Sequence, residues 1–573
     1  MSASPGSAAS GGAALRVVLY WHMHQPEYRD LRSGEYHQPW TYLHGIKDYV
    51  DMAAHLEAVP EARAVVNFVP ILLEQIEDYA DQIDSFLRNS GALRDPLLAA
   101  LAGPVLPGNR AARLELIRQC LRVNAERLIE PFPAYHKLAG VARWLPEHPE
   151  MMLYVNDQYL VDLLVWYHLA WMGETVRRGD ARIKALLKKA SGFSLHDRRE
   201  LLAVIGELLR GLRGRYTALA QRGQIELSMT PYAHPIMPLL LDIQSATEAM
   251  PDVSLPFLPC YPGGEERVRW HLQQGLACFE DYFGLRPAGC WPSEGSLSEA
   301  TLDLLSEAGF RWTASGENVL RNSLAASDMT PEDGACIHQR YQLQGRPVNC
   351  FFRDDGLSDL IGFTYSDWHA DDAVANFIHH LENIADACAD KPGSVVPIIL
   401  DGENAWEFYP ANGYYFLRAL YKALAEHPRL RLCTFSECLD EGEPASLSRL
   451  TAGSWVYGTF STWIGEKDKN RAWDMLGEAK RCYDRVMATG RLDDAHRRRA
   501  QRQLAICEGS DWFWWFGDYN SAESVSDFES LYRMHLSNLY QILGEEPPAY
   551  LSEVFAHGSG DPLMGGAMRK GRE

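Results

Sequence analysis

The sequence lacks two features that would suggest a nucleic-acid or membrane partner. Its 573 residues contain 55 Lys and Arg against 76 Asp and Glu, a formal net charge of −21 at pH 7. Nucleic acids and anionic membranes attract an excess of positive charge, so this balance argues against both. No stretch approaches the roughly 20 consecutive apolar residues of a membrane-spanning helix. We therefore expect neither nucleic acid nor a membrane among the partners, and the sequence gives no prediction of oligomeric state.

Paired cysteines and the features of a signal peptide are also missing. The 11 cysteines are an odd number, scattered singly without a Cys-x-x-Cys pair. This pattern fits reduced thiols in a cytoplasm better than a disulfide framework or a zinc ribbon. No basic residue precedes Arg16, and the first apolar run, 17–21, is short and continues into His22 and His24. We predict a cytoplasmic protein.

What the sequence has in surplus is aromatic residues. It contains 16 Trp, 26 Tyr and 20 Phe. Many would belong to a packed core, but the segment DWFWWFGDY over 511–519 interleaves aromatic with acidic residues. An apolar core does not need such interleaving, whereas sugar rings stack on aromatic faces next to polar groups. We therefore expect some of these rings to line a sugar-binding site.

Short apolar runs ending in polar or aromatic clusters recur along the chain. They are 17–21, 64–69, 225–229, 289–291, 311–314, 348–352 and 395–400. Such runs, separated by helical patterns, are typical of buried parallel strands in repeated βα units, so the fold class is α/β and most simply a barrel. Helical periodicity dominates between about 75 and 220 and again from about 466.

Reacting groups in a βα barrel lie at the C-terminal ends of the strands. The runs that end near 291 and 400 are followed by Glu294, and by Asp401 and Glu403, each close to a tryptophan, Trp291 or Trp406. Taken singly, such a carboxylate is often a helix cap or an ion-pair partner. A buried strand that delivers several carboxylates is costly unless they face a cleft, and a carboxyl pair is what glycoside hydrolysis needs.

Two histidines support a different hypothesis. His22 and His24 are two residues apart on the first predicted strand, so they share one face and could hold a metal ion. His44, His234 and Asp401 could complete such a site, as in amidohydrolase-like or deacetylase-like enzymes. Against this interpretation, the sequence has no other tightly spaced histidine cluster, and a histidine at a barrel mouth can simply bind substrate hydroxyls. We predict no metal and no cofactor.

Five segments in a fixed order carry a family resemblance. They are His24-Gln25-Pro26, GQIELSMTPYAHPI over 223–236, CWPSEGSLSE over 290–299, ILDGENAWE over 399–407 and STWIGEKDKNRAW over 461–473. This order resembles the five sequence regions of glycoside hydrolase family 57, and the resemblance runs from about residue 17 to residue 550. It implies an incomplete (β/α)7 barrel, TIM-like, with a helical insertion and a helical C-terminal region.

With this resemblance the chain divides into four parts. We predict a flexible tail over 1–14, a catalytic barrel over 15–445 with a helical insertion at about 75–220, a helical region over 446–555 that completes the active site, and a flexible tail over 556–573.

The resemblance also implies roles for individual residues. Glu294 matches the family's nucleophile and Asp401 its general acid/base in a retaining mechanism on α-glucosidic bonds. Glu403 is then expected to raise the pKa of Asp401 by like-charge repulsion. The expected substrate-binding residues are His24, His234, Trp291, Glu403, Trp406 and Trp463. Weaker candidates are His22, Glu74, Glu226, Arg353, Asp359 and Asp511.

Within the family, DGENAWE and WIGEKDKNRAW look more like the α-amylase and amylopullulanase members than like branching enzymes or 4-α-glucanotransferases. We therefore expect an enzyme that hydrolyses α-glucans such as starch, glycogen or maltodextrins. Transfer to a sugar acceptor on the same site, a metal-dependent hydrolase and a non-catalytic glucan-binding protein remain alternatives. The balance between hydrolysis and transfer depends on whether water or a sugar hydroxyl reaches the glycosyl-enzyme.

Overall fold

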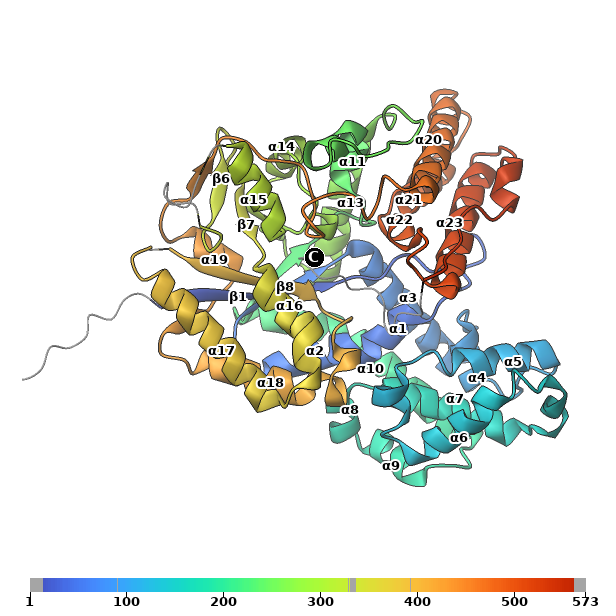
Figure 1. The fold of residues 1–573 in the computed structure, drawn as a ribbon. Helices are drawn as coiled ribbons and strands as arrows, with labels where there is room; N and C mark the ends of the chain where they lie inside the picture. Colours follow the sequence, from blue (N-terminus) through green and yellow to red (C-terminus); the bar gives the residue numbers. More distant parts are fainter. Residues whose placement is uncertain (1–13, 90, 328, 330–335, 392, 561–573) are drawn as a thin grey trace, which may run out of the picture.

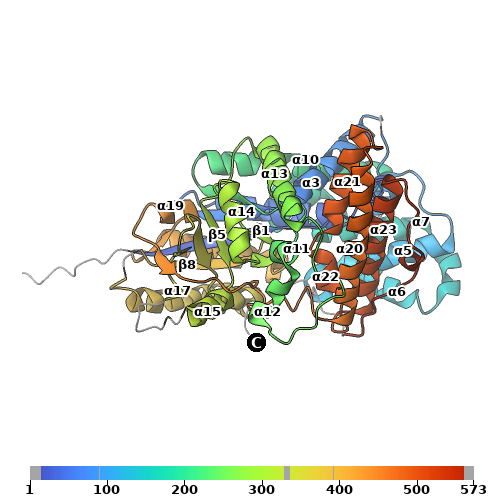
Figure 2. The same cartoon turned by 90° about the horizontal axis from the view of Figure 1, so that it is seen from above.

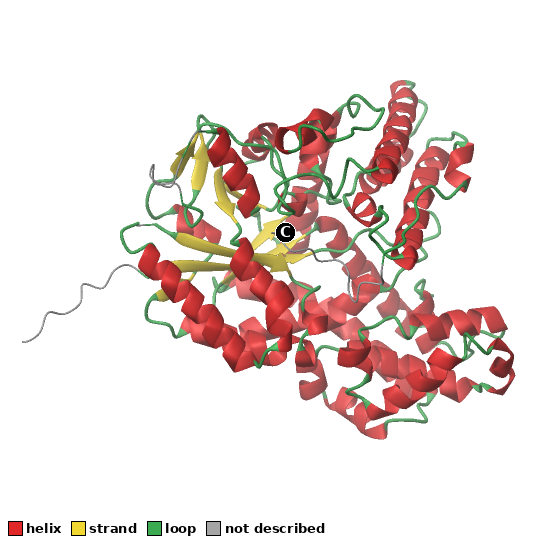
Figure 3. Ribbon diagram, in the orientation of Figure 1, coloured by secondary structure: helices red, strands yellow, loops and turns green. Residues whose placement is uncertain are grey.

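The fold is described from a computed structural model that covers residues 14–89, 91–327, 329, 336–391 and 393–560. Within these residues, ten strands form one curled sheet with the order β10-β6-β7-β5-β4-β3-β2-β1-β8, and β9 also pairs with β1 (Figure 3). The β6–β7 pair is antiparallel, whereas the other pairs are parallel. The strands are β1 (Leu15–Met23), β2 (Ala64–Phe68), β3 (Ile225–Met229), β4 (Gly289–Cys290), β5 (Trp312–Ser315), β6 (Tyr341–Leu343), β7 (Asn349–Phe352), β8 (Val395–Asp401), β9 (Leu430–Leu432) and β10 (Ala445–Leu447).

Each of the seven predicted apolar runs forms a strand, namely β1, β2, β3, β4, β5, β7 and β8. All nine residues of β1 are buried, because one face of the sheet packs inside the barrel and the other packs against helices. Val18 and Tyr20 belong to the core inside the barrel, whereas Leu19 and Trp21 belong to the core under the helices. Strands β6, β9 and β10 were not predicted, because three residues are too short for a periodic pattern.

The parallel register brings the C-terminal strand ends to one edge of the sheet. His22 of β1 pairs with Asn67 of β2 on one side and with Asp401 of β8 on the other. Between β7 and β8 the described residues form no strand ladder. Instead, the Asp354 N–H donates to Pro397 O at 2.8 Å, and Arg353 Nε donates to Ile399 O at 2.8 Å. The barrel is therefore incomplete at this seam, as predicted.

Helices follow or flank most strands (Figure 1). Between β2 and β3 the chain forms α3 (Pro70–Leu87), α4 (Pro96–Ala102), α5 (Arg110–Gln119), α6 (Pro133–Trp144), α7 (Asp157–Trp171), α8 (Glu174–Gly179), α9 (Ala181–Lys189) and α10 (Leu195–Gln221). The other barrel helices are α1 (Trp40–His44), α2 (Val50–Glu57), α11 (Met237–Leu241), α12 (Ala246–Ala249), α13 (Gly264–Phe283), α14 (Glu299–Glu307), α15 (Glu317–Ala326), α16 (Asp355–Asp359), α17 (Ala370–Ala387), α18 (Tyr414–Ala425) and α19 (Phe435–Leu439).

The C-terminal region is helical, as its periodicity predicts. It contains α20 (Lys467–Ala488), α21 (Asp494–Cys507), α22 (Asp511–Trp515) and α23 (Ala522–Ile542), which stand beside α11 and α13 in both views (Figures 1 and 2). Its main chain joins the barrel directly, since the Ser510 N–H donates to His234 O at 2.8 Å.

The division into four parts stays a prediction. The tail expected over 1–14 falls outside the described residues except for residue 14, and the tail expected over 556–573 does so from 561 onward. Within the described residues, no helix is both long enough and apolar enough to cross a membrane.

Candidate active site

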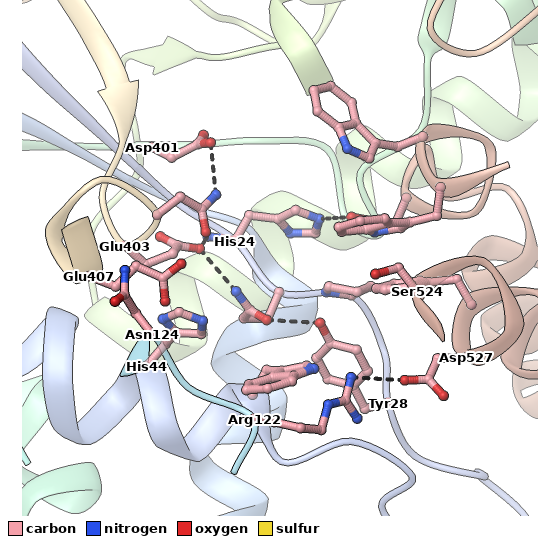
Figure 4. A pocket seen from close by; sticks show the side chains of 18 of the residues that line it. His24, Tyr28, His44, Arg122, Asn124, Asp401, Glu403, Glu407, Ser524 and Asp527 are labelled. Carbon is pink, nitrogen blue, oxygen red and sulfur yellow. Dashed lines mark hydrogen bonds and ion pairs between the residues drawn. The ribbon is translucent and has the colours of Figure 1, made fainter. Parts of the chain in front are cut away.

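A cavity of about 640 Å³ opens at the C-terminal ends of the strands. This volume is within the range of roughly 300–1,000 Å³ that small-molecule sites occupy. Its wall includes residues at the ends of four strands and residues from the C-terminal region; among them are His22, His24, Glu294, Arg353, Asp401, Glu403, Trp455 and Asp511. Figure 4 shows Asp401, Glu403 and Glu407 on one side of the cavity, and Ser524 and Asp527 of α23 facing them. The topology thus brings both predicted catalytic carboxylates to one space.

Glu294 lies in a strained turn directly after β4. The turn η5 (Ser293–Gly295) gives Glu294 a φ of 59°, which is a left-handed conformation that side-chain-bearing residues rarely adopt. The main chain is held in place because the Trp455 N–H donates to Glu294 O at 3.0 Å. Trp455 also donates its indole Nε1–H to Glu294 Oε2 at 2.9 Å. Strain of this kind is retained where the surroundings fix one side-chain direction, and here that direction is into the cavity.

Asp401 is the last residue of β8. Asn404, three residues further on, donates its amide Nδ2–H to Asp401 Oδ2 at 3.0 Å. Burial raises the pKa of Asp401 to about 6, although the hydrogen bond from Asn404 and the charges of His24 and Arg353 act in the opposite direction. A carboxyl with this pKa can hold a proton close to neutral pH and release it during a reaction.

Glu403 lies deeper in the wall than Asp401. Its Oε1 accepts hydrogen bonds from the His24 main-chain N–H at 3.0 Å, from Gln25 Nε2 at 3.3 Å and from the Tyr49 hydroxyl at 3.3 Å. Among the described residues, no group bonds its buried Oε2. Burial, and next the charge of Asp401, raise the pKa of Glu403 well above its usual range.

The electrostatic effect that was expected between these two carboxyls is reversed. Burial, not Glu403, raises the pKa of Asp401, while Asp401 raises the pKa of Glu403. The physical reason is depth: Glu403 is almost fully buried, so burial strongly disfavours its ionised form, and a neutral neighbour does not repel a forming charge.

Three histidines form a stack beside the carboxyls. The rings of His24 and His234 lie 3.9 Å apart between centroids, and His22 lies 5.2 Å from His234. Burial lowers the pKa of His22 to about 3 and the pKa of His234 well below its usual value, so both rings are neutral. His22 Nδ1 is fixed by Asn67 Oδ1 at 2.7 Å, and His234 Nδ1 by Ser510 Oγ at 2.7 Å.

The C-terminal region supplies a carboxylate to this stack. Asp511, at the start of α22, places Oδ1 at 2.8 Å from His24 Nε2. Both side chains line the cavity, whereas His234 is buried behind them. In the described residues, no hydrogen-bond partner reaches His24 Nδ1 or His234 Nε2. His24 is therefore oriented by Asp511 through Nε2, while its other ring nitrogen is buried without a hydrogen-bond partner among these residues.

Arg353 lines the cavity, whereas Asp359 is not among the described residues that line it and instead forms an ion pair with Arg353. Arg353 donates Nη2–H to Asp359 Oδ1 at 2.7 Å and Nη1–H to Asp355 Oδ1 at 2.8 Å. Its guanidinium carbon lies 5.5 Å from the centre of the Trp455 ring. Arg353 lines the cavity and fixes the seam between β7 and β8, while Asp359 lies behind it.

Three tryptophans that were expected to bind sugar lie in the packed interior instead. Trp291, Trp406 and Trp463 are almost fully buried, and the described residues that line the cavity do not include them. Trp291 belongs to the core inside the barrel, and Trp406 packs on Trp21 with ring centres 5.6 Å apart. These faces are already covered by protein, so no sugar ring can stack on them in this structure.

Two weaker candidates also lie away from the cavity. Glu226 is the second residue of β3, near the opposite end of the barrel, where it accepts hydrogen bonds from Trp312 Nε1 at 2.7 Å and Ser436 Oγ at 2.6 Å. Glu74 accepts a hydrogen bond from the Tyr232 hydroxyl at 2.8 Å and pairs with Arg502 at 2.6 Å. Both carboxylates serve structural contacts.

Other aromatic residues line the cavity, and only two of them lie in a segment that the sequence analysis expected to bind sugar. They are Tyr28, Trp40, Trp171, Phe363, Trp455, Trp514, Trp515 and Phe528. Trp514 and Trp515 belong to the aromatic and acidic segment over 511–519, which was therefore a usable signal. Trp455 lies in an irregular segment after the last strand, where no pattern marks it. Glu407, which was not among the predicted site residues, also lines the cavity, and burial raises its pKa to about 7.

The alternative metal set of His22, His24, His44, His234 and Asp401 is not assembled as that hypothesis requires. His44 Nδ1 pairs with Asp48 at 2.7 Å, and His22 is bonded to Asn67. A different set, His24, His234 and Asp511, has one donor atom from each residue within 4.8 Å of the others. Two imidazoles and a carboxylate are suitable ligands for zinc, so this cluster keeps the metal-dependent alternative open to experiment.

Solved structures resemble this fold over most of their length. A branching enzyme of glycosyl hydrolase family 57 from Thermococcus kodakaraensis has a TM-score of 0.57 at 14% identity, covering 92% of this chain and 90% of that one. A branching enzyme from Pyrococcus horikoshii has a TM-score of 0.55 at 15% identity, covering 98% and 100%. An α-amylase from Thermotoga maritima has a TM-score of 0.53 at 14% identity, covering 93% of each chain.

At such low identity these structures show the fold alone. The sequence itself carries the assignment, because the family model described as Glycosyl hydrolase family 57 matches residues 18–450. That range is well over half of the chain and includes Glu294 and Asp401. The chain therefore belongs to glycosyl hydrolase family 57 and is an enzyme of that family.

Proposed function

We propose that this enzyme cleaves α-glucosidic bonds in α-glucans such as starch, glycogen or maltodextrins, with retention of anomeric configuration. The observation that carries the proposal is that Glu294 and Asp401, at the ends of β4 and β8, line the same cavity. Aromatic rings and neutral histidines surround them, and sugar binding uses such surfaces. The solved structures with this fold include a branching enzyme and an α-amylase, which supports this substrate class.

In the proposed mechanism Glu294 attacks the anomeric carbon while Asp401 protonates the leaving oxygen. The C–O bond to the leaving sugar breaks as the bond to the Glu294 carboxylate forms, which gives a covalent glycosyl-enzyme. Asp401, now ionised, takes a proton from the incoming water, whose oxygen attacks the anomeric carbon and releases Glu294. The hydrogen bond from Trp455 Nε1 to Glu294 Oε2 supports this role because it orients the nucleophile.

The charges in the cavity are consistent with Asp401 as the acid and Glu294 as the nucleophile. Burial keeps a proton on Asp401 up to a pH of about 6, so the acid form is available at the start of a cycle. Once Glu294 is glycosylated it no longer carries charge, which favours the ionised form of Asp401 for the second step. Neutral Glu403 would offer its hydroxyl or its carbonyl oxygen to a sugar without adding a charge.

Between hydrolysis and transfer we propose hydrolysis of the α-amylase or amylopullulanase type. DGENAWE over 401–407 and WIGEKDKNRAW over 463–473 support it. The alternative is 4-α-glucanotransferase or branching activity on the same site. A specific observation favours keeping it, because the cavity wall includes Trp40 and Asp527 from other elements, and this additional surface could hold an acceptor chain.

Incubation of the purified protein with maltoheptaose separates these activities. New reducing ends indicate hydrolysis, whereas longer and shorter chains at constant reducing ends indicate transfer. Glu294→Gln should abolish both activities, and Glu61→Gln, an exposed carboxylate, is the matched control. Substantial turnover by Glu294→Gln would exclude the nucleophile assignment. Glucan binding without turnover in the unaltered protein would favour a non-catalytic binding protein.

The metal-dependent alternative has its own test. Turnover that stops with a chelator and returns with zinc, and that His234→Ala abolishes, would support a metal at His24, His234 and Asp511. Full activity after chelation excludes it.

We also propose that the protein is cytoplasmic. The support is that its 11 cysteines are scattered singly through the sequence, which fits reduced thiols.

A further inference from the structure

A second group of metal-type side chains lies on the flank of the barrel, away from the sugar cavity. Cys336 and His338 lie just before β6, and Cys388 follows the C-terminal end of α17. The two Sγ atoms and one ring nitrogen of His338 all lie within 4.8 Å of one another. The described residues that line the cavity include none of the three. The glucan mechanism therefore gives this group no task.

His338 is held in the orientation that a metal ligand needs. Its Nε2 lies 2.8 Å from Asp354 Oδ2, which leaves Nδ1 as the ring nitrogen available to a ligand. Asp354 is itself fixed, because its Oδ1 accepts the Leu357 N–H at 2.8 Å and its own N–H donates to Pro397 O at 2.8 Å. A carboxylate behind a histidine fixes the ring and its tautomer in many metal sites.

The two cysteines are also anchored through their main chains. The Tyr341 hydroxyl donates to Cys336 O at 2.8 Å and accepts the Cys336 N–H at 3.1 Å, so one side chain holds both ends of this residue. At Cys388 the N–H donates to Ile384 O at 2.9 Å, and the carbonyl accepts the Lys391 N–H at 2.9 Å. Both positions are thus fixed by contacts that do not involve the thiols.

The donor set selects the kind of metal. Two thiolates and an imidazole suit zinc, whereas magnesium and calcium require oxygen ligands. In a tetrahedral zinc site with bonds of about 2.0–2.3 Å, neighbouring donor atoms lie roughly 3.5–3.8 Å apart. The observed separations are below 4.8 Å, so a small movement of side chains closes the site. Cys336 and His338 are partly exposed, which leaves access for the ion and for water as a fourth ligand.

We propose that Cys336, His338 and Cys388 bind a zinc ion that links the segment before β6 to the C-terminal end of α17. The role is structural. His338 O accepts the Val395 N–H at 2.9 Å, so the zinc site contacts the first residue of β8. Asp401 is the last residue of the same strand, at its opposite end. The ion thereby supports the seam where β7 and β8 lack a regular ladder. A disulfide between the two cysteines is the competing outcome, but it would not account for the hydrogen bond by which Asp354 orients His338 toward the thiols.

Elemental analysis of the purified full-length protein tests the proposal. After incubation with zinc and removal of the excess, we expect about one zinc ion per chain. Cys336→Ser and Cys388→Ser should each lose it, while Cys260→Ser, which removes an exposed cysteine, should retain it. His24→Ala should also retain it, which separates this site from the cluster beside the cavity. Zinc retained by Cys336→Ser, or lost from His24→Ala alone, would overturn the proposal.

Cobalt binding can be measured on the unaltered protein, so this test does not require that any variant folds. Co²⁺ bound to the unaltered protein by thiolates in a tetrahedral site should show intense visible bands and a thiolate-to-metal charge-transfer band. The absence of both bands would contradict the proposed ligands, as would a non-reduced mass that shows a disulfide between Cys336 and Cys388. Activity on maltoheptaose per folded molecule should stay within about two-fold in Cys388→Ser, because the site is outside the cavity. Failure of the zinc site therefore leaves the proposed glucan activity untouched.

Discussion

Asp511 Oδ1 lies 2.8 Å from His24 Nε2, although the two residues are separated by 487 positions in the sequence. The contact joins the residue directly after the first strand of the barrel to the first turn of α22. It makes the C-terminal region a part of the candidate active site, since His24 is oriented by a carboxylate from outside the barrel. The region after residue 466 is thus expected to be necessary for activity and not only for stability.

Asp511→Asn should lower kcat/KM on maltoheptaose by about 10–100-fold, because a hydrogen bond to a charged group contributes roughly 1.5–3 kcal/mol. The asparagine keeps the shape of the side chain but loses the charge that orients His24. Steady-state kinetics measures the effect. Asp252→Asn, at an exposed position, is the control. Unchanged kinetics in Asp511→Asn would show that the contact with His24 has no catalytic consequence.

Trp455→Phe should lower kcat at least ten-fold with a smaller effect on KM, since it removes the indole N–H that contacts Glu294 Oε2 and a hydrogen bond to a charged group contributes about 1.5–3 kcal/mol. Trp515→Phe is the matched control; its ring lines the cavity and stacks on Phe528, with ring centres 4.8 Å apart. This control should change KM more than kcat. The reverse pattern in the two variants would assign Trp455 to substrate binding instead of nucleophile positioning.

The pH dependence of kcat/KM should report Asp401. Burial raises its pKa to about 6, and the protonated form is the acid, so kcat/KM should fall as the pH rises through about 6. Asn404 donates to the ionised carboxyl and so lowers this pKa. Asn404→Ala should therefore move the alkaline limb to higher pH, by up to about one unit. A shift to lower pH, or no shift, would contradict the assignment of Asp401 as the acid.

The sequence predicted the framework of this fold well. All seven apolar runs became strands, because a strand buried on both faces must be apolar throughout, and that property is local. The start of the helical insertion was placed a few residues late: α3 begins at Pro70, directly after β2, and proline is favoured in the first turn of a helix. The short strands β9 and β10 depend on pairing with distant partners, which a local pattern does not contain.

The site was predictable where strand ends position it. Glu294, Asp401 and His24 reach the cavity because each follows or ends a buried strand. The location of each tryptophan, in a core or in the cavity wall, could not be predicted in this way, because the local sequence around a buried ring and around a cavity-lining ring looks the same. Trp291 and Trp406 lie in cores, whereas Trp455 reaches Glu294 from an irregular segment. Deciding between them requires the packing of elements that are far apart in the sequence.

Glu508 is expected to be a main connection between the barrel and the C-terminal region. It follows α21 and is almost fully buried, where it accepts hydrogen bonds from the Tyr261 hydroxyl at 2.6 Å, Arg267 Nε at 2.9 Å and His271 Nε2 at 2.8 Å. Burial alone would raise its pKa, but Arg267 and His271 outweigh burial and lower the pKa to about 2. The ionised form is therefore the one that stabilises the folded chain.

Glu508→Gln should lower Tm by several degrees at pH 7, because removing one partner of a buried ion pair costs about 3–5 kcal/mol. Since the folded pKa lies below the ordinary value, this contribution is present above pH 4.5 and is lost as the pH falls toward 2. The Tm difference between the unaltered protein and Glu508→Gln should thus shrink in acid. Glu130→Gln, at an exposed position, is the control for thermal unfolding. A Tm equal to that of the control at pH 7 would show that the two regions are held together by apolar packing instead.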